Sequence, residues 1–159
     1  MSHPLLEVPA RLYEQLIRDL AASGRGVKES GAFLLGTDDG RIRKVSSYLL
    51  YETIAPVSSS EHDYVALTAQ EMAAAWDHCY RVGLEVVADV HTHPLGPAQS
   101  LSDRAHPMVS VAGHVALIVP QFAMRGPTPA DLGVHVFHGD GRWTSMFGEQ
   151  ARAAIVVTP

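Results

Sequence analysis

The stretch Leu84–His93 reads Leu-Glu-Val-Val-Ala-Asp-Val-His-Thr-His. Five of its first seven residues are apolar, and a nearly continuous apolar run is typical of a central strand that is covered on both faces. Side chains two residues apart on a strand point to the same side, so His91 and His93 present both imidazoles to one point while Thr92 faces away. Because Pro94 disfavours helical backbone at His93, we expect the strand to continue through both histidines.

Two helices are expected upstream of this strand. From Pro9 onward, apolar residues recur at the three-and-four spacing of one helical face, and the glycine-containing region 24–26 ends the pattern. A second helix is expected from about Thr68 to Arg81, and Gly83 stops it. The residues expected on its buried face are Met72, Ala73, Trp76, Cys79 and Tyr80.

The remaining pattern indicates paired strands. Gly31–Gly36 and Arg41–Ile54 are β-prone and flank Thr-Asp-Asp-Gly, whose Asp-Gly pair favours a hairpin turn. The elements expected later are a short helical turn near Ser100–Ser102, a strand around His114–Pro120, and a hairpin of Gly133–Phe137 with Arg142–Phe147. The sum predicts an α/β fold in which helices flank a curved, mostly antiparallel sheet.

The amino-acid composition indicates the number of domains and excludes some classes of partner. The chain has 159 residues and is 47% apolar, which suits one core and a single domain over residues 1–159. Its net charge of -5, without a Lys/Arg cluster, predicts binding neither to nucleic acid nor to an anionic membrane. No window approaches the ~18 apolar residues of a membrane span, and the first residues lack a basic segment followed by an apolar one. The single cysteine, Cys79, cannot form an internal disulfide, so the cytoplasm is the expected compartment.

A third metal ligand is expected from the segment that follows the histidines. Asp103 lies beyond the Gly/Pro-rich loop of residues 94–99, in the first turn of a short helix, where its carboxylate can return to His91 and His93. Two imidazoles and a carboxylate are a usual ligand set for zinc. Zinc held by three protein ligands keeps one position for water and lowers the pKa of that water toward ~7. We therefore expect these three residues to hold a catalytic zinc ion.

Hydrolysis at such a site also needs a group that moves protons. Glu29 is the best general acid/base, because it immediately precedes Ser-Gly-Ala-Phe-Leu-Leu-Gly, a small-residue entry into a buried strand. An ordinary exposed acid is the alternative for Glu29. Ser100 is expected to donate its hydroxyl to the oxyanion of a tetrahedral intermediate, with capping of the next helix as its alternative role. Capping is the role expected of Ser102.

These five positions together resemble the JAMM motif of JAB/MPN-domain metallopeptidases. The resemblance is carried by Glu29 with the Ser-Gly-Ala-Phe-Leu-Leu-Gly that follows it, by His91-Thr92-His93-Pro94, and by Ser100-Leu101-Ser102-Asp103. The loop between His93 and Ser100 is slightly shorter than in the commonest members. The resemblance implies a cytidine-deaminase-like α/β fold, a catalytic zinc, and cleavage of peptide or isopeptide bonds after the C-terminal glycines of ubiquitin-like proteins.

The short bacterial members of this family are the most similar in pattern. They imply as partners a ubiquitin-like protein or its conjugates, together with E1-like and E2-like enzymes of the same system, sometimes within antiviral defence. Release of a sulfur-carrier protein is an alternative activity. A catalytically silent module that binds a ubiquitin-like partner is the alternative outside enzymes, and the presence of all three ligands, the acid and the serine disfavours it.

Other residues near the motif have no predicted catalytic role. His106 and His114 lack a ligand spacing and are expected to be surface or hydrogen-bonded histidines. Asp89 lies on the ligand face of the strand, and the sequence leaves open whether it supports a ligand or is a polar residue at a sheet edge. The single Cys79 excludes the paired thiolates of a zinc nucleobase deaminase, and its place on a buried helix face argues against a thiol nucleophile.

Overall fold

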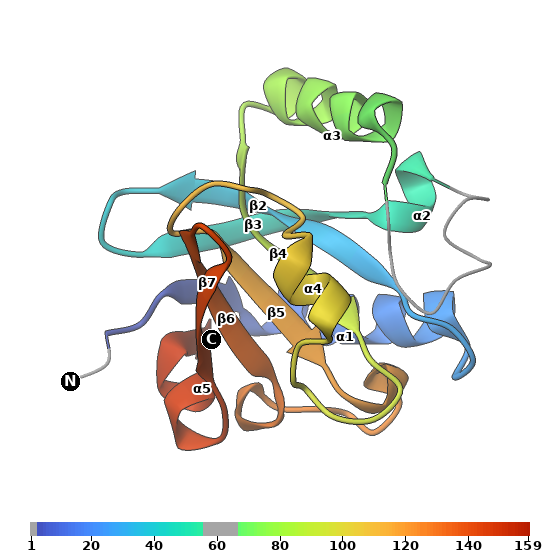
Figure 1. Ribbon diagram of the computed structural model, residues 1–159, viewed down its shortest axis with the longest axis vertical. Helices are drawn as coiled ribbons and strands as arrows, with labels where there is room; N and C mark the ends of the chain where they lie inside the picture. The colour runs from blue at the N-terminus through green and yellow to red at the C-terminus, as the bar shows by residue number, and fades with distance from the viewer. Residues whose placement is uncertain (1–2, 56–66) are drawn as a thin grey trace.

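Within residues 3–55 and 67–159, which the computed structural model describes, the strands form one eight-stranded sheet. The strands are β1 (Leu6–Pro9), β2 (Gly31–Asp38), β3 (Arg43–Leu50), β4 (Glu85–Thr92), β5 (Val115–Val119), β6 (Gly133–Gly139), β7 (Arg142–Met146) and β8 (Ile155–Thr158). Their order across the curled sheet is β7-β6-β5-β4-β2-β3-β1-β8 (Figure 1). The sheet is mixed: four of these ladders are antiparallel, and β1 with β3, β1 with β8 and β4 with β5 are parallel.

Helices cover both faces of this sheet. They are α1 (Ala10–Gly24), α2 (Tyr51–Ile54), α3 (Ala69–Val82), α4 (Leu101–Ala105) and α5 (Glu149–Ala154), with 3-10 turns η1 (Gln121–Ala123) and η2 (Pro129–Asp131). Buried residues of α1 and α5 pack against one face, and those of α3 pack against the other. In Figure 1, α4 crosses in front of β4 and β5. The α/β fold with flanking helices expected from the sequence is confirmed.

Strand β4 lies between β2 and β5, so the predicted central strand is correct. Its side chains alternate between the two faces of the sheet. Ala88 and Val90 belong to the core cluster that includes α1, whereas Asp89 and His91 line a pocket beside α4 on the opposite face. Thr92 faces away from the histidines, as expected, and its Oγ1 accepts a hydrogen bond of 2.9 Å from the backbone N–H of Ser30.

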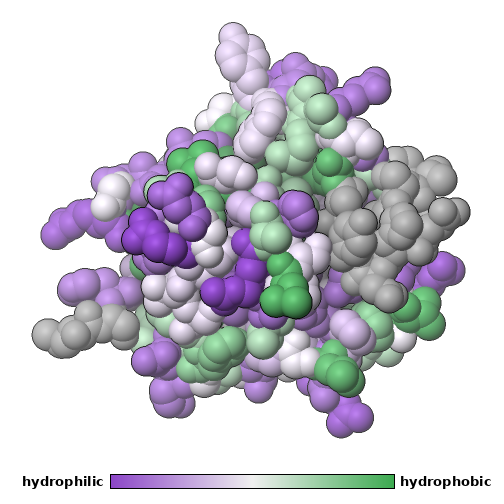
Figure 2. All heavy atoms as spheres, viewed as in Figure 1, coloured by the Kyte–Doolittle hydropathy of each residue, from purple (hydrophilic) through white to green (hydrophobic). Residues whose placement is uncertain are grey.

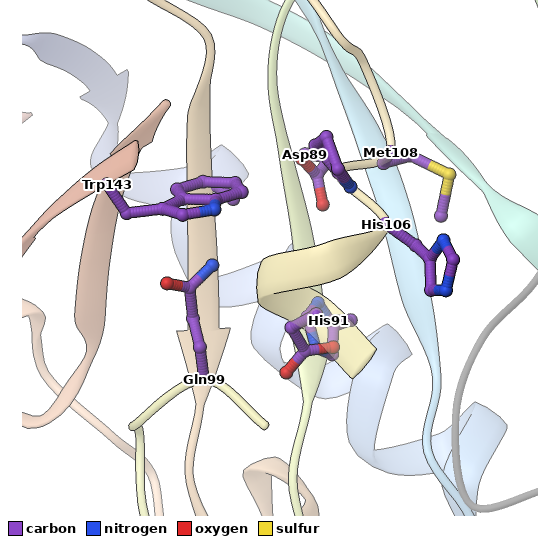
Figure 3. Close-up of a pocket in the computed structure, with 9 residues that line it drawn as sticks. Asp89, His91, Gln99, His106, Met108 and Trp143 are labelled. Carbon is purple, nitrogen blue, oxygen red and sulfur yellow. The ribbon is translucent and has the colours of Figure 1, made fainter. Parts of the chain in front are cut away.

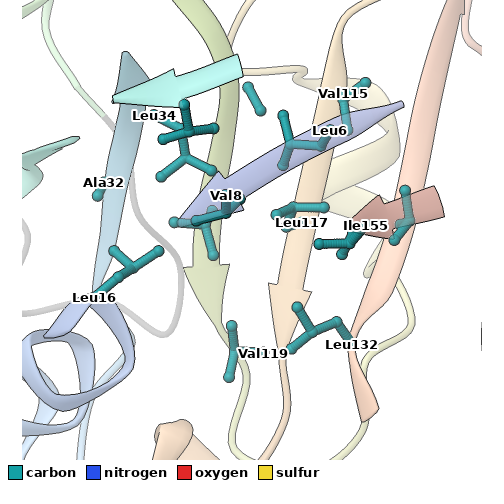
Figure 4. Packing of buried hydrophobic residues seen from close by; sticks show 14 of the residues in the cluster. Leu6, Val8, Leu16, Ala32, Leu34, Val115, Leu117, Val119, Leu132 and Ile155 are labelled. Atoms are coloured by element: carbon teal, nitrogen blue, oxygen red, sulfur yellow. The ribbon is translucent and has the colours of Figure 1, made fainter. Parts of the chain in front are cut away.

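Two clusters of buried side chains hold the layers together. The larger one joins the strands to α1 and α5 (Figure 4), and its members include Leu6, Val8, Leu16, Leu34, Leu117, Leu132 and Ile155. The smaller one, on the face of the histidines, contains Phe33, Leu35, Leu49, Tyr51, Ala75 and Cys79. Strand β2 contributes to both clusters because its successive side chains point to opposite faces. Full burial of one such leucine or phenylalanine stabilises the fold by about 1.5–3 kcal/mol.

Helix α3 begins and ends where the sequence predicts, but its buried face differs from the expected one. A capping box of Thr68 and Glu71 starts the helix, and Gly83 ends it in the left-handed conformation. Its buried residues are Ala75 and Cys79. Ala73, which was expected on the buried face, is exposed, and Trp76 and Tyr80 are 43% and 88% exposed. The expectation for these two aromatic side chains was wrong because apolar residues also populate protein surfaces, and periodicity alone does not tell which edge of an apolar stripe faces the core.

The outer edge of the sheet was not predicted. The hairpins of β2 with β3 and of β6 with β7 occur as expected. The four-residue strand β1 pairs in parallel with β3 and with β8, and α5 leads into β8. Strands this short carry little periodic signal, and their pairing joins segments that are far apart in the sequence.

The molecular surface is mixed in polarity. On the face drawn in Figure 2, hydrophobic residues are scattered among hydrophilic ones and do not merge into one continuous area. In the described ranges 3–55 and 67–159, no helix combines the length and the apolar character needed to cross a lipid bilayer.

We expect Gly31→Ala to destabilise the protein by about 1–3 kcal/mol, because overpacking of a tight contact has this magnitude. A Cβ at Gly31 would lie 2.5 Å from the Tyr51 ring and 2.7 Å from the Val90 carbonyl. Gly24→Ala is the control, since its Cβ would meet only the Ser30 side chain, at 3.7 Å or more, which is ordinary van der Waals contact. Urea-induced unfolding of both variants tests this expectation, and equal midpoints for the two would contradict it.

Candidate metal centre

His91 and His93 lie together where β4 ends. Their Nε2 atoms are 3.0 Å apart. The N–H of His93, the residue after β4, donates to the carbonyl of Val119 at the end of β5 (2.9 Å). The strand therefore ends one residue before the expected end, although the backbone bond of His93 continues the pairing with β5 and both imidazoles meet at one point.

Asp103 reaches the histidines from the first turn of α4. Its Oδ1 lies 3.3 Å from His91 Nε2, and its Oδ2 lies 3.0 Å from His93 Nε2. Helix α4 starts with a capping box in which Ser100 Oγ accepts from the Asp103 N–H (3.1 Å) and Asp103 Oδ2 accepts from the Ser100 N–H (2.8 Å). The helix cap is therefore Ser100, and the expectation that Ser102 caps the helix was wrong because Ser102 lies inside α4.

The three side chains fit one small divalent ion. Their ligand atoms all lie within 4.8 Å of one another. Tetrahedral zinc, about 2.0–2.2 Å from each nitrogen or oxygen, separates two ligands by roughly 3.3 Å, which is close to the 3.0–3.3 Å between these atoms. In the part of the chain that the structure describes, no other group of three metal-ligating side chains comes together.

Electrostatics also favour a cation at this position. Burial lowers the pKa of His91, but the hydrogen bond and charge of Asp103, helped by Asp89 and Glu29, leave that pKa raised above 6.5. Burial alone would raise the pKa of Asp103, yet its bonds to His91 and His93 hold that pKa well below its usual range. The aspartate is thus ionised at neutral pH and offers a full negative charge to an ion.

Glu29 lies beside this group, at the entry to β2. Its Oε1 is 3.7 Å from His93 Nε2, and its side chain is 8% exposed. The register that sets Gly31 opposite His91 brings the residue there. Ser30 fixes the backbone just before the strand, because its Oγ donates to the carbonyl of Leu20 in α1 (2.8 Å). The carboxylate lies outside the ligand triangle but near enough to share a water molecule with it.

Ser100 caps helix α4, which was the alternative role expected for it from the sequence. Its oxygen accepts the Asp103 N–H as the cap of α4. A hydroxyl carries one donor proton in addition to its acceptor lone pairs. Capping therefore leaves Ser100 able to donate a hydrogen bond to a substrate oxygen.

A small cavity of about 40 Å³ adjoins the ligands under α4 (Figure 3). Its lining includes Asp89, His91, Gln99, Asp103, His106 and Trp143. Asp89 forms a buried pair with His114, with 2.6 Å between Oδ1 and Nε2. Asp89 thus lies behind the ligands in a central strand, and the alternative of a sheet-edge residue was wrong. His114 is hydrogen-bonded, as expected.

Sequence reasoning missed one contact that fixes α4. The indole Nε1 of Trp143, in β7, donates to the carbonyl of Arg104 (3.1 Å). This contact ties the helix that carries Asp103 to a strand far along the sequence. No motif or periodicity relates these two residues, so the sequence held no signal for it.

Comparison with known proteins identifies a family and a related protein. A family model described as prokaryotic homologs of the JAB domain matches residues 9–128. A probable metalloprotease, y4jG of Sinorhizobium fredii (strain NBRC 101917 / NGR234), is 22% identical over 121 residues, which are 74% of this chain and 75% of that protein.

Two solution structures share the fold. Protein DSY2949 from Desulfitobacterium hafniense aligns with a TM-score of 0.66 and 17% identity, over 97% of this chain and 93% of that one. A protein from Salinibacter ruber aligns with a TM-score of 0.60 and 24% identity, over 96% and 91% of the two chains. At these identities the likeness concerns the fold alone.

We expect Asp103→Asn to weaken zinc binding by more than roughly 100-fold, which exceeds the ~10–100-fold typical of losing a residue behind the ligands. An amide can still accept the Ser100 N–H, so α4 should keep its cap. Asp131→Asn is the matched control, because Asp131 accepts the Thr128 N–H at 2.8 Å in an equivalent capping box. Competition with a chromogenic chelator measures the affinities, and a variant that binds zinc as tightly as wild type would remove Asp103 from the ligand set.

Proposed function

Because this chain belongs to the prokaryotic homologues of the JAB domain, we propose that it is a zinc metallopeptidase that cleaves after the C-terminal glycines of a ubiquitin-like protein. The bond cleaved is a peptide or isopeptide bond. The observation that carries the proposal is the convergence of His91, His93 and Asp103 within 4.8 Å, with the buried carboxylate of Glu29 beside them. The S. fredii relative, a probable metalloprotease, supports the same class of reaction.

His91, His93 and Asp103 would hold the ion, and bound zinc would supply an activated water and polarise the scissile carbonyl. Glu29 accepts the proton of the attacking water and passes it to the departing amine. Its side chain is only 8% exposed, and exclusion of bulk water strengthens electrostatic interactions of this kind. Ser100 donates a hydrogen bond from its hydroxyl to the oxygen on which negative charge develops.

The size of the cavity favours a glycine-ended tail. The cavity of about 40 Å³ beside the ligands has room for about three water molecules, since each needs about 10–15 Å³ of such space. Residues without large side chains next to the scissile bond suit such a space. A flexible tail would bind extended, with main-chain hydrogen bonds that supply affinity.

The wider setting follows from the same proposal. The partners would be a ubiquitin-like protein or its conjugates, with E1-like and E2-like enzymes of a bacterial conjugation or antiviral system. Cys79 is buried and unpaired, which agrees with a reducing cytoplasm. A sulfur-carrier peptidase is the second candidate activity, since such a carrier also ends in a flexible glycine tail.

The decisive test uses zinc-loaded protein and a ubiquitin-like protein fused through its terminal glycines to a reporter. We expect cleavage after the glycines, and we expect Glu29→Gln to slow it by about 10²–10⁴-fold while zinc binding is retained. Mass spectrometry locates the cut, and a chelator should abolish it.

The control for this test is Glu85→Gln, which changes an exposed glutamate at the other end of β4 and should leave the rate unchanged. If a panel of ubiquitin-like and sulfur-carrier fusions stays intact although zinc binds stoichiometrically, the protein is a silent binding module instead.

We expect Ser100→Ala to lower kcat by about 10²–10³-fold with little change in KM, as loss of an oxyanion donor does. It should also destabilise the fold by about 1 kcal/mol through loss of the cap. Thr68→Ala removes the equivalent cap of α3, whose Oγ1 accepts the Glu71 N–H at 3.1 Å, and should show the stability loss alone. Steady-state kinetics and thermal melts separate the two effects. Equal kcat values for Ser100→Ala and wild type would leave Ser100 as a cap only.

A further inference from the structure

The loop that joins His93 to Asp103 is held through alternate backbone carbonyls. The carbonyl of His93 accepts from the N–H of Phe122 (2.9 Å), and that of Leu95 accepts from the N–H of Gln121 (3.1 Å). The carbonyl of Pro97 accepts from the side chain of His135, with 3.0 Å to Nε2. Residues 94–99 form neither helix nor strand, so these contacts largely define the path between two proposed ligands.

The first two donors come from the left-handed turn η1. Gln121, Phe122 and Ala123 have φ values of 55°, 54° and 62°. The left-handed region costs roughly 1–2 kcal/mol for each residue other than glycine. The surrounding structure sustains this cost, and the turn directs two successive N–H groups at the ligand loop. These donors belong to the backbone, so no side-chain substitution other than one to proline can remove them.

The third donor is the imidazole of His135, which lies in β6 and is fully buried. A carbonyl oxygen only accepts hydrogen bonds, so Nε2 must carry the proton. Nδ1 then accepts from Ser145 Oγ at 2.7 Å. Burial lowers the pKa of His135 and favours this neutral form. Both ring nitrogens are thus committed, and the ring is fixed in one orientation.

The loop approaches β6 closely at this point. A Cβ on Gly133 would lie 2.1 Å from the Pro97 carbonyl oxygen, so a residue without a side chain is needed there. The ring of Phe147 packs edge-on against His135, with 5.6 Å between ring centroids. The Pro97 carbonyl therefore lies against Gly133 and His135 of β6, and Phe147 supports the His135 ring.

We propose that His135 is a positioning residue for the metal centre: by donating Nε2–H to the Pro97 carbonyl, it fixes the loop that brings Asp103 to His91 and His93. This inference rests on the metal site of the proposed function. His135 lies outside residues 9–128, which the family model matches. Without this bond the metal must order the loop on binding, and the entropy cost of that ordering lowers its affinity.

The test measures zinc affinity by chelator competition for His135→Leu, which keeps the apolar bulk but has no donor. We expect a loss of about 10–100-fold, the range found for residues that orient metal ligands. His135→Gln restores a terminal N–H donor and should recover most of the affinity. His138→Leu is the matched control, because the exposed side chain of His138 lies on the same strand and bonds to Thr144 (2.6 Å), away from the ligand loop.

A merely structural role would lower the melting temperature of the metal-free protein without changing the affinity of the folded protein for zinc, and that result would overturn the proposal. Failure of wild type to bind zinc would overturn both this inference and the metal site. Failure to cleave any modifier, with the expected affinities, would overturn only the proposed reaction and leave the positioning role established.

A second measurement uses the wild-type protein and does not depend on the folding of a variant. Nitrogen-15 NMR of the histidine rings reports which nitrogen carries the proton. We expect His135 in the Nε2–H form at neutral pH, with a slowly exchanging proton. A ring protonated only on Nδ1 cannot donate to Pro97 and would overturn the proposal.

Discussion

Strands β2 and β4 are paired so that Gly31 lies opposite His91. Just beyond that pair, the Thr92 N–H donates to the Ser30 carbonyl and the Ser30 N–H donates to Thr92 Oγ1, both at 2.9 Å. Since side chains alternate along a strand, a slip of one residue would turn both histidines into the apolar layer under α1. The register therefore sets the direction of the imidazoles and also brings Glu29 beside them. The pairing register of β2 and β4 therefore places Glu29 next to His91 and His93.

Much of this arrangement was visible in the sequence because its signals are local. The apolar run of β4, the alternation of His91 with Thr92, and the Asp-Gly turn between β2 and β3 each depend on neighbours along the chain. The contacts that hold the site were not visible. Trp143 with Arg104 and His135 with Pro97 join segments that only the completed sheet brings together. The short strands β1 and β8 were not predicted for the same reason. Each has only four residues, and they pair with each other across most of the sequence.

Several residues serve two purposes in this small fold. Asp103 accepts the Ser100 N–H as part of a capping box and faces both histidines with the same carboxylate. Ser100 caps α4 and keeps its hydroxyl proton for a hydrogen bond to a substrate oxygen. Because helix geometry fixes the distance between a cap and the third residue after it, the hydroxyl and the carboxylate keep their relation whenever α4 forms. A five-residue helix that would be marginal alone is thereby held by the cap, by Trp143 and by the ligand loop.

The pairing of β1 has a consequence for the order of folding. Leu6 lies opposite both Arg43 in β3 and Ile155 in β8, so one strand joins segments from early and late in the described sequence. Contacts of such wide separation slow folding, since loop closure must precede their formation. During synthesis, Glu29, His91, His93 and Asp103 all leave the ribosome before β6 to β8 do. A nascent chain thus carries a complete set of metal-ligating groups on an unfinished sheet, and the addition of β6 to β8 converts that loose set into a rigid one.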